Sequence, residues 1–274
     1  MVNTAPHGMS ESAVGCLVIA PHFDDEVLAC GATLARLRRQ RIKVVVCALT
    51  WSERAFSGTY DAQEHVRRNR QQAESALENL GVKDCLFPDE FWPSDTDLHV
   101  RADMSLAPRS VLLESLISLI RRTRPLTVIT THPRDFHNDH RAAAISAKEA
   151  VYQAARAGIA GSTESFREPI LLHGLVDVEH ETQFRYDVYS PVSSEELECK
   201  VRALSAYSGF VGTADYEGKS LFGSESIRDW IYASARLRGL SVGHEFAEAF
   251  ELGNFSPQVS LDMLIDQAKT RWAE

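Results

Sequence analysis

Short apolar, β-prone runs alternate with longer amphipathic segments through the first half of the chain, and this alternation constrains the fold more than any other feature. Runs with few polar residues are typical of strands that are covered on both faces of a sheet. Each run is followed by apolar residues at three- and four-residue spacing, which is the pattern of an amphipathic helix. Strand and helix in regular succession predict a parallel, doubly wound sheet. The expected strands are residues 15–20, 43–50, 85–88 and 126–131, and the helices that follow them are 24–41, 62–80, 110–122 and 139–157.

The second half of the chain is less regular. Residues 170–189 alternate in a strand-like manner, and helices are expected at 194–208, 224–239 and 260–273. The sequence shows no internal repeat and no low-complexity linker between the two halves. We therefore expect a single domain over residues 1–274, with a core at about 15–160 and a C-terminal elaboration at about 161–274. The predicted fold class is α/β, with a mostly parallel sheet flanked by helices.

Composition excludes several classes of protein and of partner. Of the 274 residues, 44% are apolar and 24% are charged, which is ordinary for a globular protein. The net charge of −9 argues against a nucleic-acid partner and against an anionic membrane surface. No apolar run approaches the ~20 residues of a membrane helix, and the polar segment Met1 to Ser12 is unlike a secretory signal. Five scattered cysteines without a C-x-x-C pair indicate reduced thiols in a cytoplasmic protein. These features are compatible with a homo-oligomer.

Two polar segments follow directly after predicted strands and form the candidate site. They are residues 21–26, which read P-H-F-D-D-E, and residues 132–140, which read H-P-R-D-F-H-N-D-H. Ligands collect at the carboxyl ends of parallel strands. The first turn lacks the glycines of a dinucleotide site, its acids would repel phosphate, and the chain contains no P-loop sequence. Imidazoles and carboxylates together suit a divalent cation such as zinc.

The spacing within these segments supports a cation site. His22 and Asp25 lie three residues apart across a strand-to-helix turn, and His140 is expected on the first turn of another helix. Two histidines and one carboxylate leave an open coordination position for water, as catalytic zinc sites do. Asp24 would lie near that water, and the helix dipole should keep it ionised. The alternatives are that the acids only cap a helix and that the histidines lie on a surface loop, but two such clusters at equivalent places in the sheet favour the cation site.

These residues resemble the motifs of the LmbE-like N-acetylglucosaminyl deacetylase family, also called the PIG-L family. The family motif [A/P]-H-P-D-D-E is matched by residues 21–26, and a second motif, D-x-H-x-D-H, is matched by residues 135–140. Phe23 and Asn138 stand where the family often has proline. Gln71 and Gln72 also depart from the family, which often has acids there. Weaker likenesses to the family are V-L-A-C-G-A-T-L at residues 27–34, Arg70 before Leu80-Gly81, Arg238-Gly239, and A-E-A-F at residues 247–250.

The resemblance implies a Rossmann-like fold and a zinc-dependent N-deacetylase, which is a carbon–nitrogen amide hydrolase. The resemblance implies that His137 acts on the carbonyl oxygen or on the leaving amine of the substrate, and that Asp139 orients His137. The site residues that the resemblance implies are the Zn²⁺ ligands His22, Asp25 and His140, the general base Asp24, the catalytic pair His137 and Asp139, and the sugar contacts Arg70 and Asp89.

The expected reaction removes the N-acetyl group from an N-acetylglucosamine-type sugar or glycoconjugate, and a zinc-activated water releases acetate. The same ligands also suit iron or another divalent ion. Two alternatives are a metal-dependent amidase on another sugar-linked amide and a non-catalytic sugar-binding relative. A third is a glycoside hydrolase with two carboxylates, which needs no metal.

Overall fold

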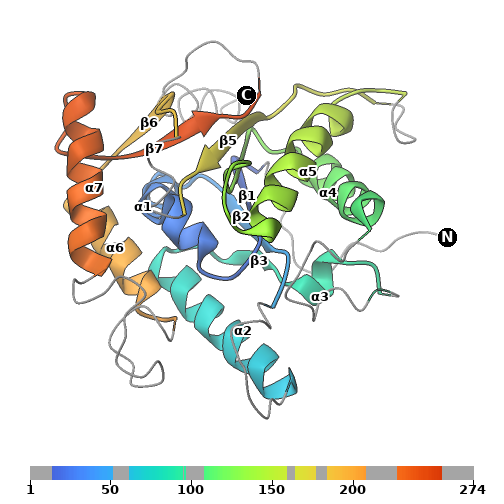
Figure 1. Ribbon diagram of the computed structural model, residues 1–274, viewed down its shortest axis with the longest axis horizontal. Coiled ribbons are helices and arrows are strands. Elements are labelled where there is room, and N and C mark those ends of the chain that lie inside the picture. The colour runs from blue at the N-terminus through green and yellow to red at the C-terminus, as the bar shows by residue number, and fades with distance from the viewer. Residues whose placement is uncertain are drawn as a thin grey trace.

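The computed structural model describes residues 14–51, 62–94, 96, 108–158, 164–176, 184–207 and 227–254. In these residues a seven-stranded sheet has the strand order β3-β2-β1-β4-β5-β7-β6 (Figure 1). The first five strands pair in parallel, whereas β7 is antiparallel to both β5 and β6. The predicted α/β class with a mostly parallel sheet is therefore confirmed. The strands are β1 (Cys16–Ala20), β2 (Val44–Ala48), β3 (Asp84–Leu86), β4 (Thr127–Thr130), β5 (Ile170–Gly174), β6 (Val188–Val192) and β7 (Phe246–Leu252).

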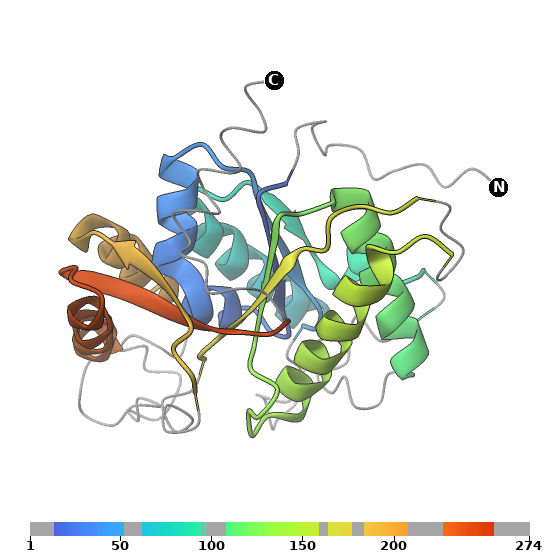
Figure 2. The same cartoon turned by 90° about the horizontal axis from the view of Figure 1, so that it is seen from above.

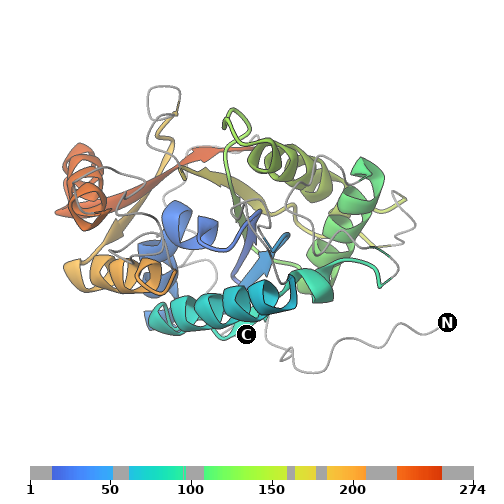
Figure 3. The ribbon, with the colours of Figure 1, turned by 60° about the horizontal axis from the view of Figure 1, so that its bottom comes forward.

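Helices cover both faces of the sheet. α4 and α5 lie on one face, and α1, α2 and α6 lie on the other, where α6 runs beside both α1 and α2 (Figures 2 and 3). α7 packs along β7. In the described part of the chain, no helix is long and apolar enough to cross a bilayer. The helices are α1 (Asp25–Arg39), α2 (Ala62–Asn79), α3 (Pro88–Phe91), α4 (Arg109–Thr123), α5 (Asn138–Ala154), α6 (Ser194–Leu204) and α7 (Ile227–Ser241).

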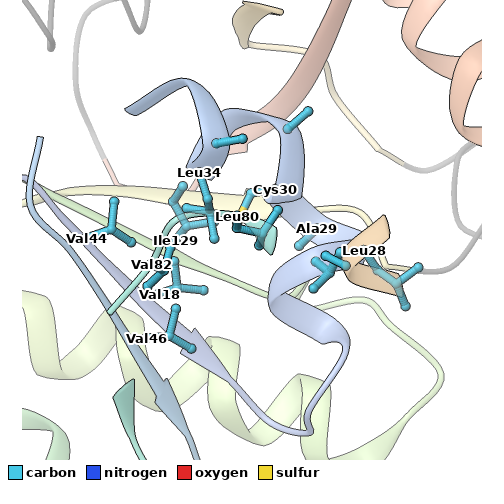
Figure 4. Close-up of a cluster of buried hydrophobic side chains, with 14 of the residues drawn as sticks. Val18, Leu28, Ala29, Cys30, Leu34, Val44, Val46, Leu80, Val82 and Ile129 are labelled. Carbon is cyan, nitrogen blue, oxygen red and sulfur yellow. The ribbon is translucent and has the colours of Figure 1, made fainter. Parts of the chain in front are cut away.

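The alternation of side chains along the central strands divides the core into two clusters. Val18 and Ile129 face the layer that contains α1, where they lie close to Cys30 and Leu34 (Figure 4). Neighbouring residues such as Leu17 face α4 and α5 instead. Every residue of β1, β2 and β4 is buried, as expected of strands between two helical layers.

The register of the central strands brings the two polar segments together. β1 pairs with β4 in parallel, and Ile19 lies opposite Thr130. Both segments therefore leave the sheet at the same edge, on strands that neighbour each other although more than 100 residues separate them in the sequence. This is also where the strand order reverses direction, which is the usual ligand position in an open α/β sheet.

The C-terminal half differs from the sequence expectation in one important respect. β7 was not expected, because two glutamates, Glu248 and Glu251, interrupt its apolar residues and give no sign of burial. The residues expected as strand-like at 170–189 contribute β5 and the start of β6. The helix expected at 260–273 lies outside the described residues.

Candidate metal centre

Three predicted ligand atoms converge at the edge of the sheet between β1 and β4. His22 Nδ1 lies 3.2 Å from His140 Nε2, and Asp25 Oδ2 lies 3.3 Å from each of these nitrogens. A tetrahedral ion with bonds of about 2.0–2.1 Å holds its ligand atoms about 3.3–3.4 Å apart. The three atoms therefore form a triangle of the size that one zinc-like cation requires.

Two further carboxylates fix the orientation of the imidazoles. Asp139 Oδ2 lies 2.9 Å from His22 Nε2, and Asp135 Oδ2 lies 2.9 Å from His140 Nδ1. If each of these nitrogens carries the proton and donates it to the carboxylate, the other nitrogen of each ring directs its lone pair at the centre of the triangle. Both acids are buried, Asp139 completely. In this hydrogen-bond pattern both imidazoles are neutral, and each presents one unprotonated nitrogen to a cation.

The charges around the centre favour a cation. Burial by itself would lower the pKa of both histidines, but the neighbouring acids outweigh it and raise the pKa of His22 to about 9 and that of His140 to about 11. Burial would likewise raise the pKa of Asp25, yet the positive charge of His140 and hydrogen bonds from both imidazoles hold that pKa well below its usual range. Positive charge is therefore stabilised at this place, so the residues present fit a divalent cation.

A third imidazole lies beside the triangle. The ring of His137 is centred 4.6 Å from that of His22 and 4.8 Å from that of His140, and about half of its side chain is exposed. Its Nδ1 accepts a hydrogen bond from the Asp139 backbone N–H at 3.2 Å, so its Nε2 carries the proton. The three histidines form an alternative set of ligands, with all donor atoms within 4.8 Å of one another.

The carboxylate of Asp139 has a different partner from the one that the resemblance implies. It was expected to orient His137, but its Oδ2 lies 4.0 Å from His137 Nδ1, beyond hydrogen-bonding distance. Its side chain bonds to His22 instead. Asp135, to which the sequence analysis gave no role, holds both the His140 ring and, at 2.8 Å, the backbone N–H of His137.

Asp24 lies next to the triangle in an unusual backbone conformation. It precedes α1 with φ of 102°, a region that favours glycine, while its carbonyl accepts hydrogen bonds from Val27 and Leu28. In the described part of the chain, its carboxylate makes no hydrogen bond. The expectation that the helix dipole keeps Asp24 ionised needs correction, because burial, and then the charges of Asp25 and Glu26, raise its pKa well above the usual range.

The two predicted sugar contacts, Arg70 and Asp89, pair with each other. An Arg70 guanidinium nitrogen lies 2.9 and 3.0 Å from the carboxylate oxygens of Asp89, and both side chains are partly exposed. The guanidinium also lies 3.8 Å from the ring centre of Phe87, which belongs to an aromatic cluster with Phe23 and Trp51. Phe23 is thus a packing residue at the place where the family often has proline.

The tryptophans that could stack on a sugar are largely core residues. Trp51 is 1% exposed, and Trp92 is 4% exposed with its indole N–H donating to the Leu49 carbonyl at 2.7 Å. Tyr60, another aromatic residue on a loop expected near a strand end, lies outside the described residues.

The protein is an α/β fold with a cluster of imidazoles and carboxylates at the reversal point of its sheet, and this cluster is a candidate metal site. The family model described as PIG-L, GlcNAc-PI de-N-acetylase, matches residues 17–151. Residues 17–151 of the chain are thus similar to the PIG-L (LmbE-like) family. The matched region contains every residue of the triangle and both supporting acids.

Individual relatives agree with this family. The Escherichia coli (strain K12) protein named uncharacterized deacetylase YaiS is 31% identical over 127 residues, which are 46% of this chain and 62% of that protein. The chain thus matches less than two thirds of the length of this relative. Two solved structures share the fold at lower identity. The N,N'-diacetylchitobiose deacetylase from Pyrococcus horikoshii is 18% identical, with a TM-score of 0.63 over 88% of this chain and 84% of that chain. GalB, the 4-carboxy-2-hydroxymuconate hydratase from Pseudomonas putida, is 20% identical, with a TM-score of 0.67 over 90% of this chain and 98% of that chain.

Proposed function

We propose that this protein is a metal-dependent hydrolase that removes the N-acetyl group from an N-acetylglucosamine-type sugar or glycoconjugate. The observation that carries the proposal is the triangle of His22 Nδ1, Asp25 Oδ2 and His140 Nε2, which lies beside the half-buried carboxyl group of Asp24. The match of residues 17–151 to a de-N-acetylase family model and a curated relative named as a deacetylase support the reaction type.

The proposed ligands are the three atoms of the triangle, and zinc is the proposed ion. When bound, such a cation supplies a Lewis acid that polarises the amide carbonyl and lowers the pKa of a coordinated water. The alternative set with His137 in place of Asp25 is less suitable, because its donor atoms spread over as much as 4.8 Å whereas the triangle is close to tetrahedral spacing.

Side chains of this protein are proposed to carry out the proton transfers of the reaction. Asp24 is the proposed general base, which takes a proton from the attacking water and holds it on its carboxyl group. A raised pKa helps Asp24 to keep that proton until the proton passes to the leaving amine. Positive charge at the centre lowers the pKa of Asp24 and so favours its ionised form, which is the form that accepts the proton. The Nε2–H of His137 is the proposed donor to the carbonyl oxygen, and the hydrogen bond from Asp139 N to its Nδ1 selects the required tautomer.

Arg70 and Asp89 are proposed to contact the sugar. Because they pair with each other at 2.9 Å and keep part of their side chains in solvent, a sugar hydroxyl group can add to this pair without uncovering a buried charge. The fold similarity to a hydratase shows that the fold also carries other chemistry, so the product must be identified directly.

Acetate release tests the proposal. The purified protein is incubated with N-acetylglucosamine, N,N'-diacetylchitobiose and an N-acetylglucosaminyl inositol, each with and without a chelator, and then with added Zn²⁺. We expect acetate and a free amine from at least one sugar, loss of activity with the chelator, and recovery with zinc. Acetate release that the chelator leaves unchanged would refute the metal-dependent mechanism. Release of a reducing sugar without acetate would favour the glycoside hydrolase instead.

A further inference from the structure

Helix α1, which begins directly after Asp24, is interrupted in the middle. Cys30 has φ of −152° and ψ of 18°, outside the helical region. In a continuous α-helix the backbone N–H of Ala32 would donate to the carbonyl of Leu28. At this kink, both groups bond to side chains from distant parts of the sequence.

A buried ion pair occupies the gap in the hydrogen-bond ladder. The Lys200 ammonium on α6 donates to the Leu28 carbonyl at 2.8 Å and to Glu248 Oε1 on β7 at 2.6 Å. Glu248 in turn accepts from the backbone N–H groups of Ala32 at 3.3 Å and Thr33 at 2.7 Å. The series from Leu28 O through ammonium and carboxylate to Ala32 N therefore replaces one helical hydrogen bond with three.

The residues around the Lys200–Glu248 ion pair are buried and closely packed. Lys200 and Glu248 are 5% and 3% exposed, so each charge depends on the partners that it has inside the protein. A Cβ atom at Gly31 would lie 3.1 Å from Lys200 Cγ, and one at Gly174 would lie 2.7 Å from the Ala29 Cβ atom. Apolar residues in place of the ion pair would leave one carbonyl and two N–H groups of α1 unpaired in the core.

A second contact from the same part of the chain reaches the first turn of α1. The Tyr207 hydroxyl, just after α6, donates to Glu26 Oε1 at 2.7 Å. The other carboxylate oxygen of Glu26 accepts from the backbone N–H of Asp24 at 3.1 Å. Tyr207 thus supports the acid that holds Asp24 in its positive-φ conformation.

We infer that Lys200, Glu248 and Tyr207 are positioning residues for the metal centre. They fix the direction of the first half of α1 and thereby the places of Asp24 and Asp25, which frame the centre. This inference rests on the proposed function. It also gives the C-terminal elaboration a role, because residues in and just after α6 and in β7 contact α1 and so support the turn that carries Asp24 and Asp25.

Cobalt binding to the protein tests this inference without measuring catalysis. Co²⁺ in a tetrahedral site of nitrogen and oxygen ligands absorbs visible light, and this absorption responds to ligand geometry. The variants are Lys200→Met and the milder Tyr207→Phe, which removes a single hydroxyl group. The matched control is Arg39→Met, which removes an ion pair of 2.7 Å with Glu196 between the same two helices at the far end of α1. Circular dichroism verifies that each variant is folded.

We expect Lys200→Met to weaken cobalt binding about tenfold and to change the intensity or position of the visible bands, as the loss of outer residues does in other metal sites. Tyr207→Phe should show the same spectral change with an affinity loss of about threefold, and Arg39→Met should match the wild type. If Lys200→Met does not fold, Tyr207→Phe alone decides.

Folded variants with wild-type affinity and spectrum would overturn the positioning role while leaving the proposed function intact. A wild-type protein that binds cobalt but releases no acetate would overturn the proposed function alone. A wild-type protein that binds no cobalt would overturn both.

Discussion

Two pairs of largely buried histidines lie at the carboxyl edge of the sheet, and the charges around the two pairs are opposite in their effect. His22 and His140 have ring centres 5.2 Å apart, and those of His132 and His173 are 5.9 Å apart. His22 and His132 lie just after β1 and β4, His173 lies in β5, and His140 lies on the first turn of α5. Sequence position and burial alone would not distinguish them.

The acids around each pair account for the difference. Three carboxylates bond to His22 and His140 and raise their pKa values to about 9 and about 11. His173 bonds to the backbone carbonyl of Thr131, and burial lowers its pKa to about 4. The pKa of His132 is also lowered by burial, which outweighs the hydrogen bond to Glu251, a carboxylate that is shared with Arg134.

A histidine pair therefore becomes a cation site only where nearby acids compensate the positive charge. The second pair lacks this compensation and is a neutral part of the core. Replacements in the first pair should change metal binding, whereas matched replacements in the second should change only stability.

The largest effect is expected from the removal of a ligand. His140→Ala should lose nearly all bound metal, and its deacetylase activity should fall to background, because two donor atoms cannot hold the ion in place. Metal content after dialysis, measured by elemental analysis, checks this outcome. His173→Gln is the matched control and should keep its metal. Equal metal content in both variants would remove the distinction between the two pairs.

The next largest effect is expected at Asp24. Asp24→Asn should lower kcat by about 10²–10⁴-fold, the range for loss of a general base, while the metal remains bound. Its melting temperature should stay the same or rise, since asparagine tolerates a positive φ and burial disfavours the charge of the native carboxylate. Kinetics, metal analysis and thermal unfolding of the one variant measure the three quantities. Near-normal turnover would show that another group takes the proton.

Local patterns were sufficient to predict the central strands and the two site segments. β1, β2 and β4 are continuous apolar runs, and the polar turns after them mark the sheet edge without any knowledge of long-range contacts. Parallel pairing of neighbouring strands then determines that His22 and His140 meet. This much of the site follows from strand order and motif spacing.

The remaining features depend on tertiary contacts that a sequence does not display. Glu248 in β7 has the appearance of a surface acid, and only its contact with Lys200 explains why it is buried. Asp135 lies five residues before His140, and no sequence rule specifies that its carboxylate turns back to that ring. The ionisation of Asp24 was misjudged because a helix dipole contributes only ~0.3–1 kcal/mol, which burial of a carboxylate can exceed.

An intermediate effect is expected from the acids that support each pair. Asp135→Asn should weaken metal binding about 10–100-fold, because His140 loses the carboxylate that orients its ring. Glu251→Gln changes the corresponding acid of the second pair in the same way and should leave metal affinity unchanged. Competition titrations with a coloured chelator compare the two. Similar weakening in both would mean that general destabilisation, and not ring orientation, controls affinity.

The smallest effect concerns stability at mildly acidic pH. The pKa of His173 is about 4 when folded and about 6.5 when unfolded, so below pH 6.5 the unfolded state binds more protons. The contribution of neutral His173 is therefore fully present above pH 6.5 and declines as the pH falls towards 4. Between pH 8 and pH 5.5 the loss amounts to about 1.4 kcal/mol, or about tenfold in the unfolding equilibrium.

Urea unfolding of the wild type and of His173→Gln at both pH values isolates this contribution, because every other titrating group is common to the two proteins. Glutamine has no proton to gain in this range and can still donate to the Thr131 carbonyl, so the variant should lose less stability on acidification than the wild type. An equal loss would show that His173 titrates normally inside the fold. The second pair would then resemble the first in its capacity for charge, and the acids alone could not explain where the cation binds.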